Sequence, residues 1–143
     1  MKNLVTVYIE FSFRGKTHSP ELSLDLDEFL HTHGSIPSLY PLIASHNDFD
    51  LYSYEYEMMQ AEPLQFRDAQ GLVADFIAGG ELDIIAFETA WREHQLVEKL
   101  MAIADKNMGI KNLHENPGLK QALLDAYQLG LESHRSLNFK NLK

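Results

Sequence analysis

The chain has 143 residues, of which 45% are hydrophobic and 23% are charged. This is the composition of a globular domain rather than a disordered chain, and we expect one domain over residues 1–143. The sequence contains no cysteine, which excludes disulfides, thiolate metal sites and cysteine nucleophiles. The 21 acidic and 12 basic residues give a net charge of −9, which disfavours binding to nucleic acid or to anionic membranes.

The N-terminus and the cysteine count bear on localisation. Residues 1–4 do not begin the continuous apolar core of a signal peptide, and no stretch approaches the ~20 apolar residues of a membrane span. The absence of cysteine fits a reducing compartment. We therefore predict a cytoplasmic protein with no membrane partner.

The first half of the chain has the pattern of β-strands. Apolar residues alternate with polar ones from Val5 to Phe13, and again at Leu22, Leu24 and Leu26. Turn-forming residues occupy 14–20 between the two runs. The pattern predicts a β-hairpin.

A polar loop is expected at 31–35, followed by a short helix that begins near Pro37 and ends near His46. Residues 51–59 again alternate, with tyrosines on one face, and predict a further strand. Residues 64–66 fit either a brief extra strand or extended chain. We expect an antiparallel sheet of about three to four strands within residues 1–66.

The second half, about residues 67–135, has helical periodicity. A short helix near 73–77 is expected to stop at Gly79 and Gly80, and long helices are expected over 81–107 and 117–134. Asn116 is suited to cap the last of these, and the tail 136–143 is expected to fray. The predicted fold class is α+β, with the sheet packed against C-terminal helices.

The first long helix is apolar on two opposed faces. Its main stripe contains Leu82, Ile85, Ala86, Leu96, Leu100, Ile103 and Ala104. Ile84, Phe87 and Trp91 have i, i+3, i+7 spacing and project away from that stripe. The sheet and the last helix of the same chain could cover both faces. Alternatively, a second chain covers this stripe, which makes these residues candidates for a homodimer interface. The last helix presents the small residues Ala122, Ala126 and Gly130, which fit a close helix crossing within the domain or between chains.

Histidines suggest one enzymatic alternative. His31, His33 and His46 could meet as ligands of a divalent metal, although solvated histidines explain the same pattern. The chain has no glycine-rich phosphate loop, no H-E-x-x-H and no G-x-S-x-G. We therefore predict no catalytic residue, no cofactor and no metal site.

These patterns favour a non-enzymatic intracellular protein-interaction or regulatory domain that self-associates as a homodimer or binds a protein partner. The alternative is a small metal-assisted hydrolase or small-ligand-binding enzyme that uses the His31, His33 and His46 region. A third hypothesis, an acidic mimic of nucleic acid, rests on the net charge alone.

Overall fold

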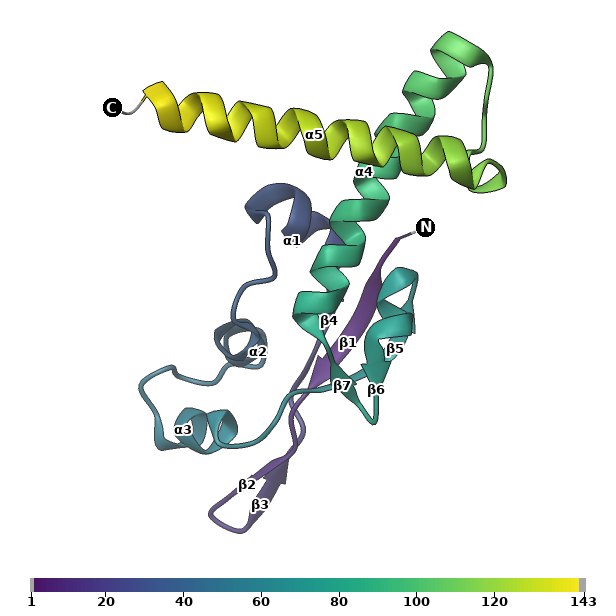
Figure 1. Ribbon diagram of the computed structural model, residues 1–143. Coiled ribbons are helices and arrows are strands. Elements are labelled where there is room, and N and C mark those ends of the chain that lie inside the picture. The colour runs from purple at the N-terminus through teal and green to yellow at the C-terminus, as the bar shows by residue number, and fades with distance from the viewer. Residues whose placement is uncertain (1, 142–143) are drawn as a thin grey trace. The chain divides into compact units, whose positions relative to one another are not determined.

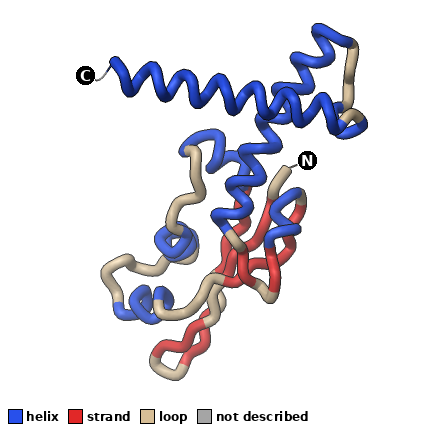
Figure 2. Tube along the Cα trace, in the orientation of Figure 1, coloured by secondary structure: helices blue, strands red, loops and turns tan. Residues whose placement is uncertain are grey.

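The computed structural model describes the backbone of residues 2–141 and the side chains of residues 2–135. The chain divides into two compact units, Met1–Trp91 and Arg92–Lys143. Every strand of the described chain belongs to the first unit (Figure 2). The α+β fold class is confirmed, with an antiparallel sheet followed by C-terminal helices. A single domain over residues 1–143 stays a prediction.

The main sheet of the first unit has three strands: β1 (Leu4–Tyr8), β4 (Glu21–Asp25) and β5 (Gln65–Gln70). Their order is β4-β1-β5, and both pairings are antiparallel (Figure 1). Val5 lies opposite Leu24, and both side chains are buried. The alternation of apolar and polar residues therefore leaves one face of the sheet on the core, as the sequence predicts.

The alternating run from Val5 to Phe13 forms two strands rather than one. β1 ends at Tyr8, and β2 (Phe11–Phe13) pairs with β3 (Lys16–His18) in a separate two-stranded hairpin. The Ile9 N–H donates to the Pro20 carbonyl at 3.1 Å between the two ladders. The predicted hairpin is present, but it is interrupted along its length.

The remaining elements of the first unit connect and cover this sheet. They are α1 (Leu26–His33), α2 (Leu39–His46), α3 (Tyr54–Gln60), the 3₁₀ helix η1 (Leu72–Phe76), the strands β6 (Ile77–Ala78) and β7 (Glu81–Leu82), and the start of α4 (Ile84–Met108). The predicted short helix ending near His46 is confirmed as α2. Strand β5 settles the open choice at residues 64–66 in favour of a strand.

The predicted strand over residues 51–59 is wrong, because residues 54–60 form helix α3. The Ser53 hydroxyl accepts a hydrogen bond from the Tyr56 N–H at 3.2 Å and so caps the helix N-terminus. Tyr56 and Met59, three residues apart, are the buried positions. The alternating tyrosines fit the period of a strand, whereas the cap at Ser53 and the spacing of the buried residues are typical of a helix.

The predicted loop at 31–35 is also wrong in part, because His31 and His33 lie in the last turn of α1. Asp25 caps the start of this helix, and Gly34 ends it with φ of 76°. The helix therefore begins directly where β4 stops.

A third correction concerns Gly79 and Gly80. They do not end an α-helix but form the turn of the β6–β7 hairpin, since Ile77 pairs with Leu82 and Ala78 with Glu81. Both glycines have positive φ, which suits such a tight turn.

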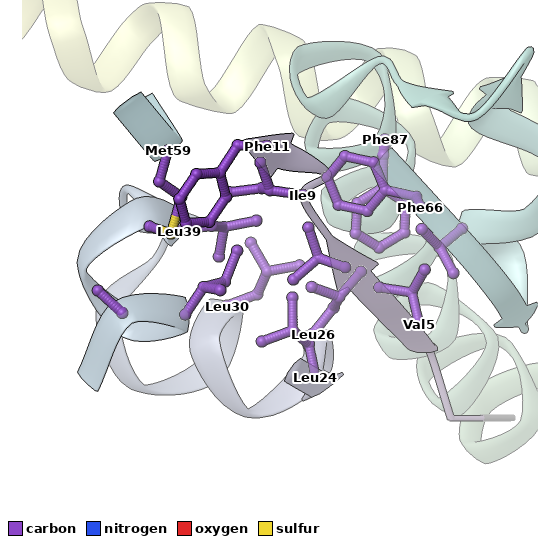
Figure 3. Close-up of a cluster of buried hydrophobic side chains, with 14 of the residues drawn as sticks. Val5, Ile9, Phe11, Leu24, Leu26, Leu30, Leu39, Met59, Phe66 and Phe87 are labelled. Atoms are coloured by element: carbon purple, nitrogen blue, oxygen red, sulfur yellow. The ribbon is translucent and has the colours of Figure 1, made fainter. Parts of the chain in front are cut away.

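The core of the first unit joins residues far apart in the sequence (Figure 3). Side chains from the sheet, from α1 to α3 and from the start of α4 meet there. Its largest fully buried members are Phe87, Ile9, Leu26, Leu39, Ile43, Met59, Val7 and Val73. Helix α4 thus contributes a central aromatic side chain to this core.

The second unit is helical, with the rest of α4, the 3₁₀ helix η2 (Leu113–Glu115) and α5 (Pro117–Asn141). The Asn116 side chain accepts from the Leu119 N–H at 3.4 Å, as expected of a cap. The core of this unit contains Leu100, Ala104 and Leu113.

The predicted frayed tail 136–143 lies largely outside the described residues, because the structure describes no side chain there and no backbone for 142 and 143. The backbone of α5 reaches Asn141. In the described part of the chain, no helix combines the length and apolar character that crossing a membrane requires.

Candidate functional site

A groove of about 550 Å³ runs beside β4, the edge strand of the sheet. The groove is lined by residues of β4, α1 and α2. We call the α1 and α2 residues its walls; both helices follow β4 in the chain (Figure 1). The residues that line it are Leu22, Ser23, Leu24, Asp25, Glu28, Phe29, Leu42, Ser45 and His46. Because four consecutive residues of β4 take part, the groove follows the strand itself rather than one face of the sheet.

The wall from α1 is positioned by the junction of strand and helix. Asp25 is the last residue of β4, and its carboxylate accepts from the Glu28 N–H at 3.3 Å. This cap turns the chain into α1 immediately after the strand. Glu28 and Phe29 in the first turn are therefore held against the groove.

The wall from α2 is fastened by Asn47, which follows the helix. The Asn47 side-chain amide donates to the Glu21 carbonyl at 3.0 Å and to the Ile43 carbonyl at 2.8 Å. One amide group thus ties the end of α2 to the beginning of β4. His46, the last residue of α2, lines the groove next to this tie.

The direction of the β4 backbone groups follows from bonds at the two ends of the strand. The Pro20 carbonyl accepts from the Ile9 N–H at 3.1 Å, and the Leu26 N–H donates to the Asn3 carbonyl at 2.9 Å. Backbone groups in an antiparallel ladder alternate in direction along the strand. The residues of β4 at even positions therefore face β1, and those at odd positions face away from it.

Leu22 and Leu24 accordingly direct their N–H and C=O groups to β1, whereas Ser23 directs both toward the groove. Glu21 obeys the same alternation, because its carbonyl is the one that accepts from Asn47. No neighbouring strand of the described chain pairs with this side of β4. Ser23 thus offers one donor and one acceptor at an open sheet edge.

The charge of the groove is negative. Asp25 and Glu28 line it, and no lysine or arginine with a described side chain does. Lys2 approaches Asp25 at 3.8 Å, but its side chain is 77% exposed, so the pair is weak. The Glu21 side chain at the end of β4 is ion-paired with Arg67.

A second polar cluster surrounds Asp27. Its carboxylate accepts from the Asn3 N–H at 2.6 Å, from the Asn3 side-chain amide at 3.0 Å and from the Trp91 indole N–H at 2.8 Å. Burial by itself raises the pKa of Asp27, but these hydrogen bonds and nearby His31 outweigh it and lower the pKa. Each donor stabilises the ionised carboxylate, so the cluster joins the sheet, α1 and α4 in a single network.

The histidines predicted as metal ligands occupy different surroundings. The His31 ring packs edge-on against Trp91 with 4.9 Å between centroids, whereas His33 is exposed and His46 lines the β4 groove. Within the described residues, no group of three or more histidine, aspartate and glutamate side chains is placed to hold a metal ion.

The predicted interface residues lie largely inside the first unit. Phe87 is 0% exposed and Trp91 is 8% exposed, and both belong to the core of this unit. Ile84 is half-buried. Phe87 and Trp91 thus have cover within their own chain, and a homodimer through this stripe stays a prediction.

The small residues of α5 are placed differently. Ala122, Ala126 and Gly130 are exposed, and a side-chain carbon added at Gly130 would meet no atom within 4 Å. The interior of the second unit is reached instead by Leu119, Leu123 and Leu124.

Sequence reasoning missed the groove and its central residue, Ser23. The alternation of β4 marks Ser23 as a polar position, but the order of strands in a sheet carries no local signal. Comparisons with protein-family models, with curated proteins and with solved structures find no match to this chain.

Proposed function

We propose that this chain is a non-enzymatic interaction domain that binds an extended segment of another polypeptide along the edge of β4. The observation that carries the proposal is the outward-facing backbone of Ser23 within a groove between β4, α1 and α2. An added strand would continue the sheet by main-chain hydrogen bonds, while the groove would hold its side chains.

The shape of the groove supports this binding mode. A volume of about 550 Å³ is in the range of ligand sites, and the site is open and lined by four consecutive residues of a strand. Along β4, the hydrogen bond from Asn47 to the Glu21 carbonyl occupies the edge at one end of the strand, and α1 begins after Asp25 at the other. The accessible edge therefore suits a short extended segment.

The enzymatic alternative has less support. His46 lies in the groove, whereas His31 packs on Trp91 and His33 is exposed on α1. The interaction function instead uses backbone groups and apolar walls that the groove brings together.

The test is a nuclear magnetic resonance titration of ¹⁵N-labelled protein with a capped neutral peptide, Thr-Val-Thr-Val-Thr. We expect the amide signals of Ser23 and Asp25 to shift, and a Thr-Val-Pro-Val-Thr peptide to bind more weakly, because proline lacks the N–H needed for pairing. Shifts that avoid β4, or equal binding of both peptides, would contradict the proposal.

A matching protein variant is Ser23→Pro. The Ser23 N–H faces away from β1, so the substitution removes no bond within the sheet, and edge strands tolerate proline at such positions. We expect a folded variant with at least about tenfold weaker peptide binding. Wild-type affinity in the folded variant would refute strand addition, and the proline peptide remains a test if the variant does not fold.

A further inference from the structure

We infer that the segment bound along β4 is a basic and apolar strand of a different protein, with its basic and apolar side chains alternating. This inference rests on the proposed function and adds the chemistry of the partner. It follows from which side chains of this chain lie on each face of an added strand.

The two faces of an added strand are set by β4 itself. A residue paired with Ser23 points to the same side of the sheet as the Ser23 side chain, whose hydroxyl lies 3.5 Å from the Thr6 hydroxyl on the exposed face. Its neighbours point to the other side, where Leu22 and Leu24 face the core.

The inward positions of the added strand meet apolar surface. Leu22, Phe29 and Leu42 all line the groove, and all three are only partly buried by their own unit. Burial of this apolar surface would stabilise the complex. Aliphatic side chains such as valine fit these inward positions.

The outward positions meet acidic surface. Glu21 and Asp25 flank Ser23 two residues away on each side, so their side chains share its face. Glu28 adds a third carboxylate at the α1 wall, and His46 is the one histidine among the described lining residues, which include no lysine or arginine. Arg67 already pairs with Glu21, so lysine or arginine at the outward positions would complement chiefly Asp25 and Glu28, and the net charge of −9 would speed the approach of a basic segment.

The same charges argue against a second copy of this chain. If two β4 strands paired antiparallel about Ser23, Glu21 of each copy would lie opposite Asp25 of the other. Like charges directly opposite destabilise a strand pair, and each chain also carries a net charge of −9. A basic partner can bond to the exposed backbone groups of β4 without this repulsion.

The experiment compares three capped, dye-labelled peptides by fluorescence anisotropy: Lys-Val-Lys-Val-Lys, Thr-Val-Thr-Val-Thr and Glu-Val-Glu-Val-Glu. We expect the lysine peptide to bind about tenfold more tightly than the neutral one, and the acidic one more weakly than both. Raising the ionic strength from about 0.05 M to about 0.5 M should reduce the advantage of the lysine peptide. Equal affinities, or preference for the acidic peptide, would overturn the inference.

Protein variants localise the charge effect. Glu28→Gln should weaken binding of the lysine peptide several-fold and should weaken binding of the neutral peptide less. Glu93→Gln, an exposed helix position in the second unit, removes the same charge from a residue that does not line the groove, and it should change neither. Equal effects of the two variants would show that only the overall charge matters and would contradict recognition at the groove.

The peptide measurements separate recognition of a basic segment from strand addition as such. If the neutral peptide binds in a Ser23→Pro-sensitive manner without any preference for lysine, strand addition stands and the basic partner is refuted. If no peptide binds, the proposed function itself fails. Sedimentation that reveals a dimer abolished by Ser23→Pro would identify a second copy as the occupant and overturn the inference.

Discussion

Replacing Asp27 with alanine should destabilise the first unit substantially. The substitution removes one carboxylate that accepts three hydrogen bonds, from the Asn3 N–H, the Asn3 side-chain amide and the Trp91 indole. Asn3 is only 4% exposed and Trp91 is buried, so their donors have little access to water in the folded chain. The variant therefore loses the bonds and leaves their donors unpaired.

The magnitude follows from the charge of the acceptor. A hydrogen bond to a charged group contributes about 1.5–3 kcal/mol, and an unsatisfied buried donor costs about 1–3 kcal/mol. The three bonds share one half-buried carboxylate, so their contributions are not additive. We expect the free energy of unfolding to fall by about 3 kcal/mol, a large part of the stability of a typical domain.

The assay is urea denaturation followed by the fluorescence of Trp91, the only tryptophan of the chain, and by circular dichroism. Asp25→Ala is the matched control, because it removes one exposed cap bond of 3.3 Å from the same helix together with a weak ion pair to Lys2, and it should cost about 1 kcal/mol. If Asp27→Ala costs no more than Asp25→Ala, the Asp27 network does not stabilise the fold as described.

Three further predictions concern the same fold. Because the pKa of Asp27 is lowered in the folded chain, the ionised carboxylate stabilises the fold fully above its ordinary pKa of 3.8, and this stabilisation is lost as the pH falls through the lower pKa of the folded chain. The difference in free energy of unfolding between wild type and Asp27→Asn should therefore become smaller as the pH falls below 3.8. A difference that stays constant with pH in urea titrations would contradict the assignment. Gly71→Ala should lower the free energy of unfolding by more than about 2 kcal/mol, because φ is +90° and the new carbon would lie 2.5 Å from the Lys2 carbonyl; a neutral effect in thermal melts would refute this. Leu113→Ala should lower the free energy of unfolding of the second unit by about 2–5 kcal/mol, and so lower the urea midpoint of the transition seen by circular dichroism. The urea midpoint of the Trp91 fluorescence transition should move less, because Trp91 belongs to the first unit. Equal shifts of the two midpoints would argue against separate units.

Much of the fold could be predicted because it depends on local patterns. The alternation of apolar and polar residues predicted that Val5 and Leu24 lie on a buried face of the sheet, as they do. The capping residue Asn116 predicted the start of the last helix. Local patterns failed at residues 51–59, where alternating tyrosines competed with a cap at Ser53. An alternating run fits a strand, but a well-capped short helix can contain the same residues when tertiary packing buries positions three apart.

The candidate site was less predictable than the fold. The sequence singled out Phe87 and Trp91 because they lie off the main stripe of a helix, but only the packed unit shows that its own core covers them. The distances between His31, His33 and His46 depend on how α1 and α2 pack, which the sequence does not show.

Composition and the spacing of neighbouring residues were enough to predict the α+β class, the net negative charge and the polar position of Ser23. The folded chain was needed to show that β4 is an edge strand, that Asn47 fastens α2 beside it, and that Ser23 lines a groove. The physical reason is that strand order and the exposure of backbone groups are set by contacts between distant segments, which no local pattern records.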